Sequence, residues 1–277
     1  MHYRISPSEW TYTDPNPFTT DGAYDSGWSC FCLLDRDDDQ AFTGRSGDGP
    51  FSARFGRGVE DLESHLADFL RYESAHRRTV ILSFPADIDA DVFVSRALAN
   101  TPPGNVIRPA DPRVVEHSTT LEAWERISAD GMLKAASQLG AGKYRAHSAS
   151  ALTEIERYYQ DEPPEYGDYV MFGGMGPGSE VILASNACGR FVMDTDAVYT
   201  PGIRLYFDNH RIIAAGLATR DGLHLTKVHR QLPLAPYLLA AITAADIDPE
   251  GRVEKWTIRL FTEKANEVFK AGHSLSL

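Results

Sequence analysis

The clearest change of hydrophobic pattern along the chain lies in residues 114–133, VVEHSTTLEAWERISADGML. Two valines begin an apolar strand, and His117 comes where that strand is expected to stop. Apolar residues then recur at three-residue steps, as on one face of a helix: Leu121, Trp124 and Ile127. Thr119 or Thr120 can cap the beginning of this helix, and Gly131 follows its last turn. The pattern therefore predicts a strand that leads directly into an amphipathic helix.

The part of the chain before this stretch has the pattern of a small α/β module. Its predicted elements, in chain order, are a strand at 28–34, a glycine-rich flexible hairpin at 44–58, a helix at 59–72, a strand at 79–84 and a helix at 91–99. The loop at 100–105 contains Pro102-Pro103-Gly104, a sequence that interrupts regular structure. We therefore predict two domains, 1–105 and 106–277.

The second domain is predicted to be rich in strands joined by turns. Its expected strands cover 143–148, 169–172, 180–184, 198–200, 203–207, 212–217 and 223–228, its expected helices cover 150–159 and 236–245, and a closing segment covers 256–265. The glycine run at 173–178 is expected to be a mobile hairpin or lid loop, because it lacks the lysine that follows a phosphate loop. The fold class predicted for the chain is α+β.

Composition and charge narrow the classes of function. The 277 residues carry a formal net charge of −12, which disfavours a broad electrostatic grip on nucleic acid. Neither a membrane-length apolar run nor a leader sequence is visible, so we expect a cytoplasmic protein without a membrane partner. The three cysteines cannot all pair and lack zinc-site spacing, so we expect reduced, buried thiols. The acidic run 35–39 is expected to be solvated, and no metal site is predicted.

A histidine and hydroxyl groups at the junction of a strand and a helix form a candidate ligand site. His117, Ser118 and Thr119 would lie beside the amides of the helix N-terminus, where a phosphate-bearing ligand is favoured. The simpler interpretation is that His117 only ends the strand. Spacing alone does not separate these two interpretations.

His117-Ser118-Thr119, followed by a helix that ends at Gly131-Met132-Leu133, resembles the strand-helix signature of the ADP-ribosyltransferase superfamily. The likeness covers residues 106–208 and is closest to the RNA 2'-phosphotransferases. It implies a C-terminal domain of two small sheets that split to form a cleft, here preceded by the α/β module. It also implies that NAD is bound as a substrate and that an acceptor attacks the ribose as nicotinamide leaves. No counterpart of the phosphotransferases' basic RNA-recognition module precedes Val106, so the acceptor stays open: protein, nucleic acid, a small phosphate or water.

The resemblance also implies roles for single residues. The cofactor-binding candidates are His117, Ser118, Thr119, Tyr144 and Arg204. His117 would contact hydroxyl groups of the adenosine side or of the ribose, and Thr119 would steady the strand and the ligand. Tyr144 would stack on nicotinamide, and Arg204 would contact a phosphate. Glu180, expected at the start of a strand, is the candidate for a catalytic glutamate.

Two other hypotheses remain open. The stretches that begin at His117 and at His224 both have the form His-x-Thr-x-apolar, and paired motifs of this form resemble the two-histidine phosphoesterases. The chain would then be a metal-free phosphodiesterase in which His117 and His224 serve as general base and general acid. The other hypothesis is a protein that binds a nucleotide or a partner without catalysis.

Overall fold

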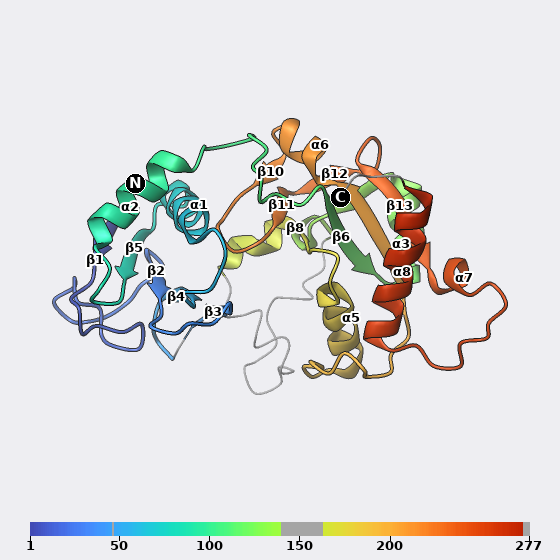
Figure 1. Ribbon diagram of the computed structural model, residues 1–277, viewed down its shortest axis with the longest axis horizontal. Coiled ribbons are helices and arrows are strands. Elements are labelled where there is room, and N and C mark those ends of the chain that lie inside the picture. Colours follow the sequence, from blue (N-terminus) through green and yellow to red (C-terminus); the bar gives the residue numbers. More distant parts are fainter. Residues whose placement is uncertain (46, 140–162, 274–277) are drawn as a thin grey trace. The chain divides into compact units, whose positions relative to one another are not determined.

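The computed structural model describes residues 1–45, 47–139 and 163–273. These residues form two compact units (Figure 1). The first unit includes Met1–Gly104 and the later segment Arg220–Leu223, and the second unit begins at Asn105. The predicted N-terminal module, 1–105, did not include that later segment, because residues so distant in sequence are brought together only by folding.

The first unit is built on a five-stranded sheet. Its strands, in the order in which they lie side by side, are β1 (Tyr3–Ile5), β5 (Thr79–Ser83), β2 (Trp28–Leu33), β4 (Phe51–Phe55) and β3 (Ala41–Gly44). The first four are parallel, and β3 pairs with β4 in an antiparallel hairpin. Helices α1 (Leu62–Ala75) and α2 (Ala90–Asn100) pack on each other. The predicted strands, hairpin and helices of this unit are confirmed.

Strand β2 lies in the middle of this sheet and is buried along nearly its whole length, which accounts for its apolar sequence. Phe31 stacks on Phe55 of β4. The sulfur atoms of Cys30 and Cys32 lie 3.2 Å apart, and both residues are buried. They are free thiols, as predicted, whereas the free thiol of Cys188 is exposed, contrary to the prediction of a buried one.

Within its described residues, the second unit contains three small antiparallel sheets. Their strands are β13 (Leu238–Thr243), β9 (Ile203–Asp208) and β6 (Val114–Thr119) in the first, β10 (Ala218–Thr219), β11 (Thr226–His229) and β8 (Tyr169–Phe172) in the second, and β12 (Gln231–Pro233) and β7 (Met132–Lys134) in the third. The helices are α3 (Leu121–Asp130), α5 (Gly178–Cys188), α6 (Asn209–Ala214), α7 (Ala244–Ile247) and α8 (Ile258–Gly272), with 3-10 turns at Ala136–Leu139 and Pro164–Asp168. The chain is therefore of mixed α and β structure, in agreement with the α+β class.

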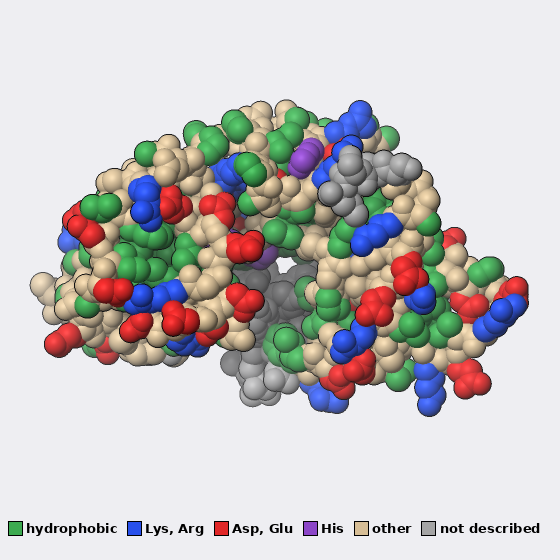
Figure 2. All heavy atoms as spheres, in the orientation of Figure 1, with side chains coloured by type: hydrophobic (Ala, Val, Ile, Leu, Met, Phe, Trp, Pro, Cys, Tyr) green, Lys and Arg blue, Asp and Glu red, His purple; other side chains and the backbone are tan. Residues whose placement is uncertain are grey.

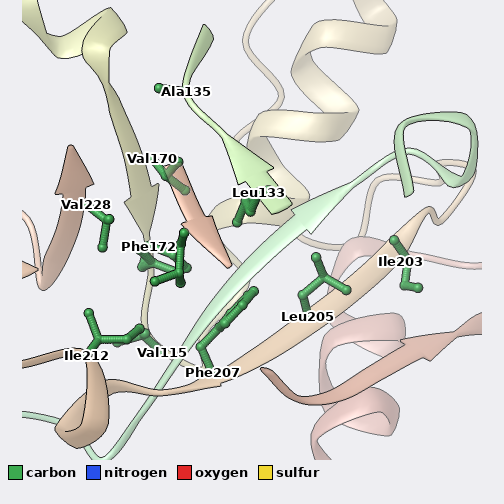
Figure 3. Packing of buried hydrophobic residues seen from close by; sticks show 11 residues of the cluster. Val115, Leu133, Ala135, Val170, Phe172, Ile203, Leu205, Phe207, Ile212 and Val228 are labelled. Carbon is green, nitrogen blue, oxygen red and sulfur yellow. The ribbon is translucent and has the colours of Figure 1, made fainter. Parts of the chain in front are cut away.

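The three sheets of the second unit share one hydrophobic core. Phe207 of the first sheet, Phe172 of the second and Leu133 of the third all belong to it, and Figure 3 shows their side chains gathered between the strands. Helix α3 packs on this core through Trp124 and Ile127. These two residues are part of the apolar face that the sequence predicted.

The stretch 114–133 has the predicted form of a strand followed by a helix. Thr120 is the residue that caps α3, because its Oγ1 accepts a hydrogen bond from the amide of Ala123 at 3.1 Å. Gly131 ends the helix with a φ of 64°, in the left-handed region that suits glycine. Local signals in the sequence were sufficient to place both ends of this helix.

Two segments predicted as strands are helical. Residues 180–184 belong to α5, which begins after Pro177 and ends at Gly189 in the left-handed conformation. Residues 212–217 overlap α6, whose first turn is capped by the side chain of Asp208. In both cases the start and stop signals outweigh the β-branched residues between them.

One predicted helix is a strand. Residues 236–245 contain β13, whose backbone pairs with β9 over most of its length. Alanine and leucine favour a helix locally, but pairing with a buried neighbour decides the conformation. At 198–200 the structure has a single bridge between Val198 and Thr257 rather than a strand. The elements predicted at 143–148 and 150–159, and with them Tyr144, lie outside the described residues.

The described residues include no helix of the length and apolarity that a membrane span needs. On the face of each unit seen in Figure 2, acidic and basic side chains are interspersed. Such a mixed surface, on a chain with a formal net charge of −12, gives a polyanion little overall attraction.

Candidate functional site

Strand β6 presents alternate side chains to opposite faces of its sheet. Val115 belongs to the core shared by the three sheets, and His117 and Thr119 follow it on the same face. Glu116 and Ser118 point to the other face, where α8 packs on the sheet. The predicted group of His117, Ser118 and Thr119 is therefore divided between the two faces of the strand.

His117 lies at the point where the first and second sheets of the second unit diverge. Glu116 of β6 and Gly173, the residue after β8, form an isolated bridge in which they exchange two backbone hydrogen bonds of 2.9 Å each. In the next position along β6, Nδ1 of His117 lies 3.0 Å from the carbonyl oxygen of Met171 in β8. Next to the backbone bridge, the contact between the two segments is therefore made by the imidazole side chain and not by backbone pairing.

The surroundings of His117 determine which ring nitrogen is available. Burial lowers the pKa of His117, although the Met171 carbonyl and the charge of Glu180 oppose this. The ring is therefore neutral at pH 7. Because a carbonyl oxygen can only accept, Nδ1 carries the hydrogen and Nε2 is the acceptor. Nε2 can receive a hydrogen bond from a hydroxyl group or take a proton.

The opposite face of β6 holds a buried acid-arginine cluster. Its members are Glu116 and Ser118 of β6, Ser179 and Glu180 in the first turn of α5, and Arg204 of β9. The side chains of Glu116, Glu180 and Arg204 are each 0% exposed. Nη1 of Arg204 pairs with Glu180 and lies 3.2 Å from Oε2 of Glu116. The two carboxyl groups therefore share one guanidinium group in a site closed to water.

Two serine hydroxyl groups connect the carboxyl groups of this cluster. The Oγ atom of Ser179 lies 2.7 and 2.6 Å from the two oxygens of Glu116 and 2.8 Å from Oγ of Ser118. Ser118 in turn donates to Glu180. The pKa of Glu116 is raised to about 7, chiefly by burial. This value includes the charge of Arg204, which lowers the pKa, and the charge of Glu180, which raises it.

The glycine run 173–178 connects β8 to α5 and is anchored at several points. Its carbonyl groups at Met175 and Gly176 accept hydrogen bonds from Asn266, at 2.7 Å, and from Arg204, at 2.8 Å. At Gly173 an added β-carbon would lie 2.9 Å from Oε1 of Glu116, so a larger residue here would require that carboxyl group to shift. The segment is therefore an anchored loop that leads into α5, and not the predicted hairpin.

The structure distributes the predicted site residues over separate places. Ser118, Glu180 and Arg204 meet in the acid-arginine cluster, with Glu180 at the start of a helix rather than a strand. His117 faces the other side of β6. His224 precedes β11, and its ring meets Tyr166 edge-on at 5.4 Å. The two histidines of the phosphodiesterase hypothesis thus have different neighbours.

Sequence reasoning missed Glu116 and Ser179. Glu116 had a partial signal, because it is a carboxyl group in a strand that begins with two valines, and a carboxyl group buried in such a strand needs a partner. Ser179 had no such signal, because its role depends on the approach of α5 to β6. Ser179 and Glu116 are 63 residues apart in the sequence.

The chain was compared with protein-family models, with curated proteins and with solved structures. None of them matches. Within the described ranges, His, Cys, Asp and Glu side chains form no group of three or more that could hold a metal ion.

Proposed function

We propose that the second unit binds NAD and transfers its ADP-ribosyl group to an acceptor. The observation that carries this proposal is the position of His117, at the point where two small sheets part, with its ring fixed by the carbonyl group of Met171. The strand-helix unit formed by β6 and α3 also supports the proposal, because it has the form that the resemblance to ADP-ribosyltransferases implies.

The state of the imidazole suits this chemistry. When nicotinamide leaves NAD, the ribose carbon gains positive charge, so a charged imidazolium beside it would oppose the reaction. Burial keeps His117 neutral at pH 7 and leaves Nε2 as an acceptor for a ribose hydroxyl. Thr119, on the same face of β6, is the second group proposed to hold the sugar. The proposed stacking of Tyr144 on nicotinamide rests on the resemblance alone.

The acceptor is proposed only by class: a protein, a nucleic acid, a small phosphate or water. Charge argues against a nucleic acid held by a broad basic surface, because the formal net charge is −12. The free thiols of Cys30 and Cys32, 3.2 Å apart, support the proposal that the protein works in a reducing compartment such as the cytoplasm.

Release of nicotinamide from NAD by the purified full-length chain tests the proposed function. We expect His117→Ala to lower the rate by at least about 100-fold, the usual contribution of a positioned catalytic imidazole. The matched control is His229→Ala, which removes an exposed imidazole from β11 and should leave the rate unchanged. Equal rates for the two variants would refute the role of His117, and a chain that neither binds nor consumes NAD would refute the function.

A further inference from the structure

The charges of the acid-arginine cluster do not balance when both carboxyl groups are ionised. Glu116, Glu180 and Arg204 are each 0% exposed, so two negative charges would face one positive charge without water. A net charge in such a site is costly. One additional proton on a carboxyl group makes the cluster neutral, as in other pairs of carboxyl groups that are forced together.

The hydrogen bonds of the cluster can accommodate this proton. Oxygen atoms form a continuous path from Glu116 through Ser179 and Ser118 to Glu180, and the path ends at the guanidinium group of Arg204. Each serine has one hydrogen to donate. If Glu116 is protonated, it donates to Ser179, Ser179 donates to Ser118, and Ser118 donates to the ionised Glu180. With the proton on Glu180, the same path would run in the opposite direction, but Glu180 is the carboxyl group that pairs more closely with Arg204, which favours Glu180 as the ionised member.

We propose that Glu116 keeps a proton on its carboxyl group up to near-neutral pH and is a positioning residue that holds β6 and β8 together beside His117. Its backbone makes the bridge to Gly173, and its carboxyl group lies against the same glycine and against Ser179 at the start of α5. His117, which follows it, is bonded to Met171 two residues before that glycine. A repelled, ionised carboxyl group would loosen this junction.

The other titratable groups that face Glu116 support this assignment. They are Glu180 from α5, Arg204 and Tyr206 from β9, and Tyr199 from the segment before β9. Among them, only Arg204 favours an ionised Glu116, and Glu180 binds that guanidinium group more closely. Burial raises the pKa of Glu116 to about 7 in spite of Arg204.

The protonation state is tested by comparing Glu116→Gln with the unmodified chain at about pH 5 and about pH 8, using urea denaturation. Glutamine is neutral and nearly isosteric with the protonated acid. If Glu116 is protonated in the native state, the variant gains stability relative to the unmodified chain as the pH rises. A loss of relative stability as the pH rises, or no change, would overturn the proposal.

The positioning role is tested by the Nδ1–H signal of His117 in an NMR spectrum, assigned by its absence in His117→Ala. We expect Glu116→Gln and the matched control Glu125→Ala, an exposed carboxyl group on α3, to keep the signal. Glu116→Ala should shift or lose it. If Glu116→Ala does not fold, Ser179→Ala, which cuts the hydrogen-bond path, takes its place. An unchanged signal in the folded variant would refute the positioning role.

The consequence for catalysis rests on the proposed function, but neither of these measurements uses NAD. The proton on Glu116 and the position of His117 can therefore be established even if the chain does not release nicotinamide. If it does, Glu116→Ala should lower kcat/KM for NAD, because it displaces the imidazole that is proposed to hold the ribose.

Discussion

Replacement of Gly173 by alanine tests how closely the Glu116 carboxyl group is packed. Glu116 holds the backbone of Gly173 by two hydrogen bonds of 2.9 Å, so the glycine cannot move away. The new β-carbon would lie 2.9 Å from Oε1 of Glu116, and that carboxyl group is itself bonded to Ser179 at 2.6 and 2.7 Å. Overpacking of this kind costs about 1–3 kcal/mol. We expect a loss within that range, because a shift of the carboxyl group disturbs its buried hydrogen bonds to Ser179.

Urea denaturation of the full-length chain, with hydrogen exchange at the amides of Glu116 and Gly173 as a local probe, measures this loss. The matched control is Gly176→Ala in the same loop, where no atom lies within 4 Å of the added β-carbon. Its stability should stay within about 0.5 kcal/mol of the unmodified chain. Equal stability of the two variants would refute the close packing of Glu116 on Gly173.

The stability of Glu116→Gln relative to the unmodified chain should rise by about 3 kcal/mol between pH 4.5, the ordinary pKa of the group, and pH 7, close to its native pKa of about 7. The slope is about 1.4 kcal/mol per pH unit, because in this interval the native state keeps the proton and the unfolded state loses it. Urea midpoints at several pH values measure the change. Thr120→Ala should cost about 1 kcal/mol by removing the cap of α3, and Thr120→Ser should restore it, as thermal unfolding will show. A thiol reagent should label Cys188 alone in the native protein, and Cys30 and Cys32 only after unfolding. Burial encloses the thiols of Cys30 and Cys32 and raises the pKa of Cys30. Labelling of Cys30 or Cys32 in the native protein, detected by mass spectrometry, would refute this.

Elements with complete local signals could be predicted from the sequence. The helix after β6 has an apolar face, a threonine cap at Thr120 and a glycine at its end, and each of these signals acts within a few residues. The segment at 236–245 has no such signals. Its conformation as β13 comes from pairing with β9, about 35 residues earlier, and one sequence does not show that pairing.

Part of the candidate site could be predicted from the sequence for the same reason. His117 and the polar residues beside it were visible as a motif, and the unusual carboxyl group of Glu116 stood next to them. What could not be predicted is that Arg204 and Glu180, 24 residues apart in sequence, meet in one closed cluster. Their pairing depends on where α5 begins, and the sequence had suggested a strand at that position.

The alternation of side chains along β6 also makes this strand sensitive to changes in length. The strand pairs with β9 so that Ser118 lies opposite Arg204 and His117 opposite Leu205. A deletion or insertion of one residue before Glu116 would exchange the two faces. The carboxyl group would then enter the hydrocarbon core, and the imidazole would meet the guanidinium group of Arg204. Libraries built to alter this protein can vary single residues on the His117 side of β6, but they should keep the number of residues in the strand constant.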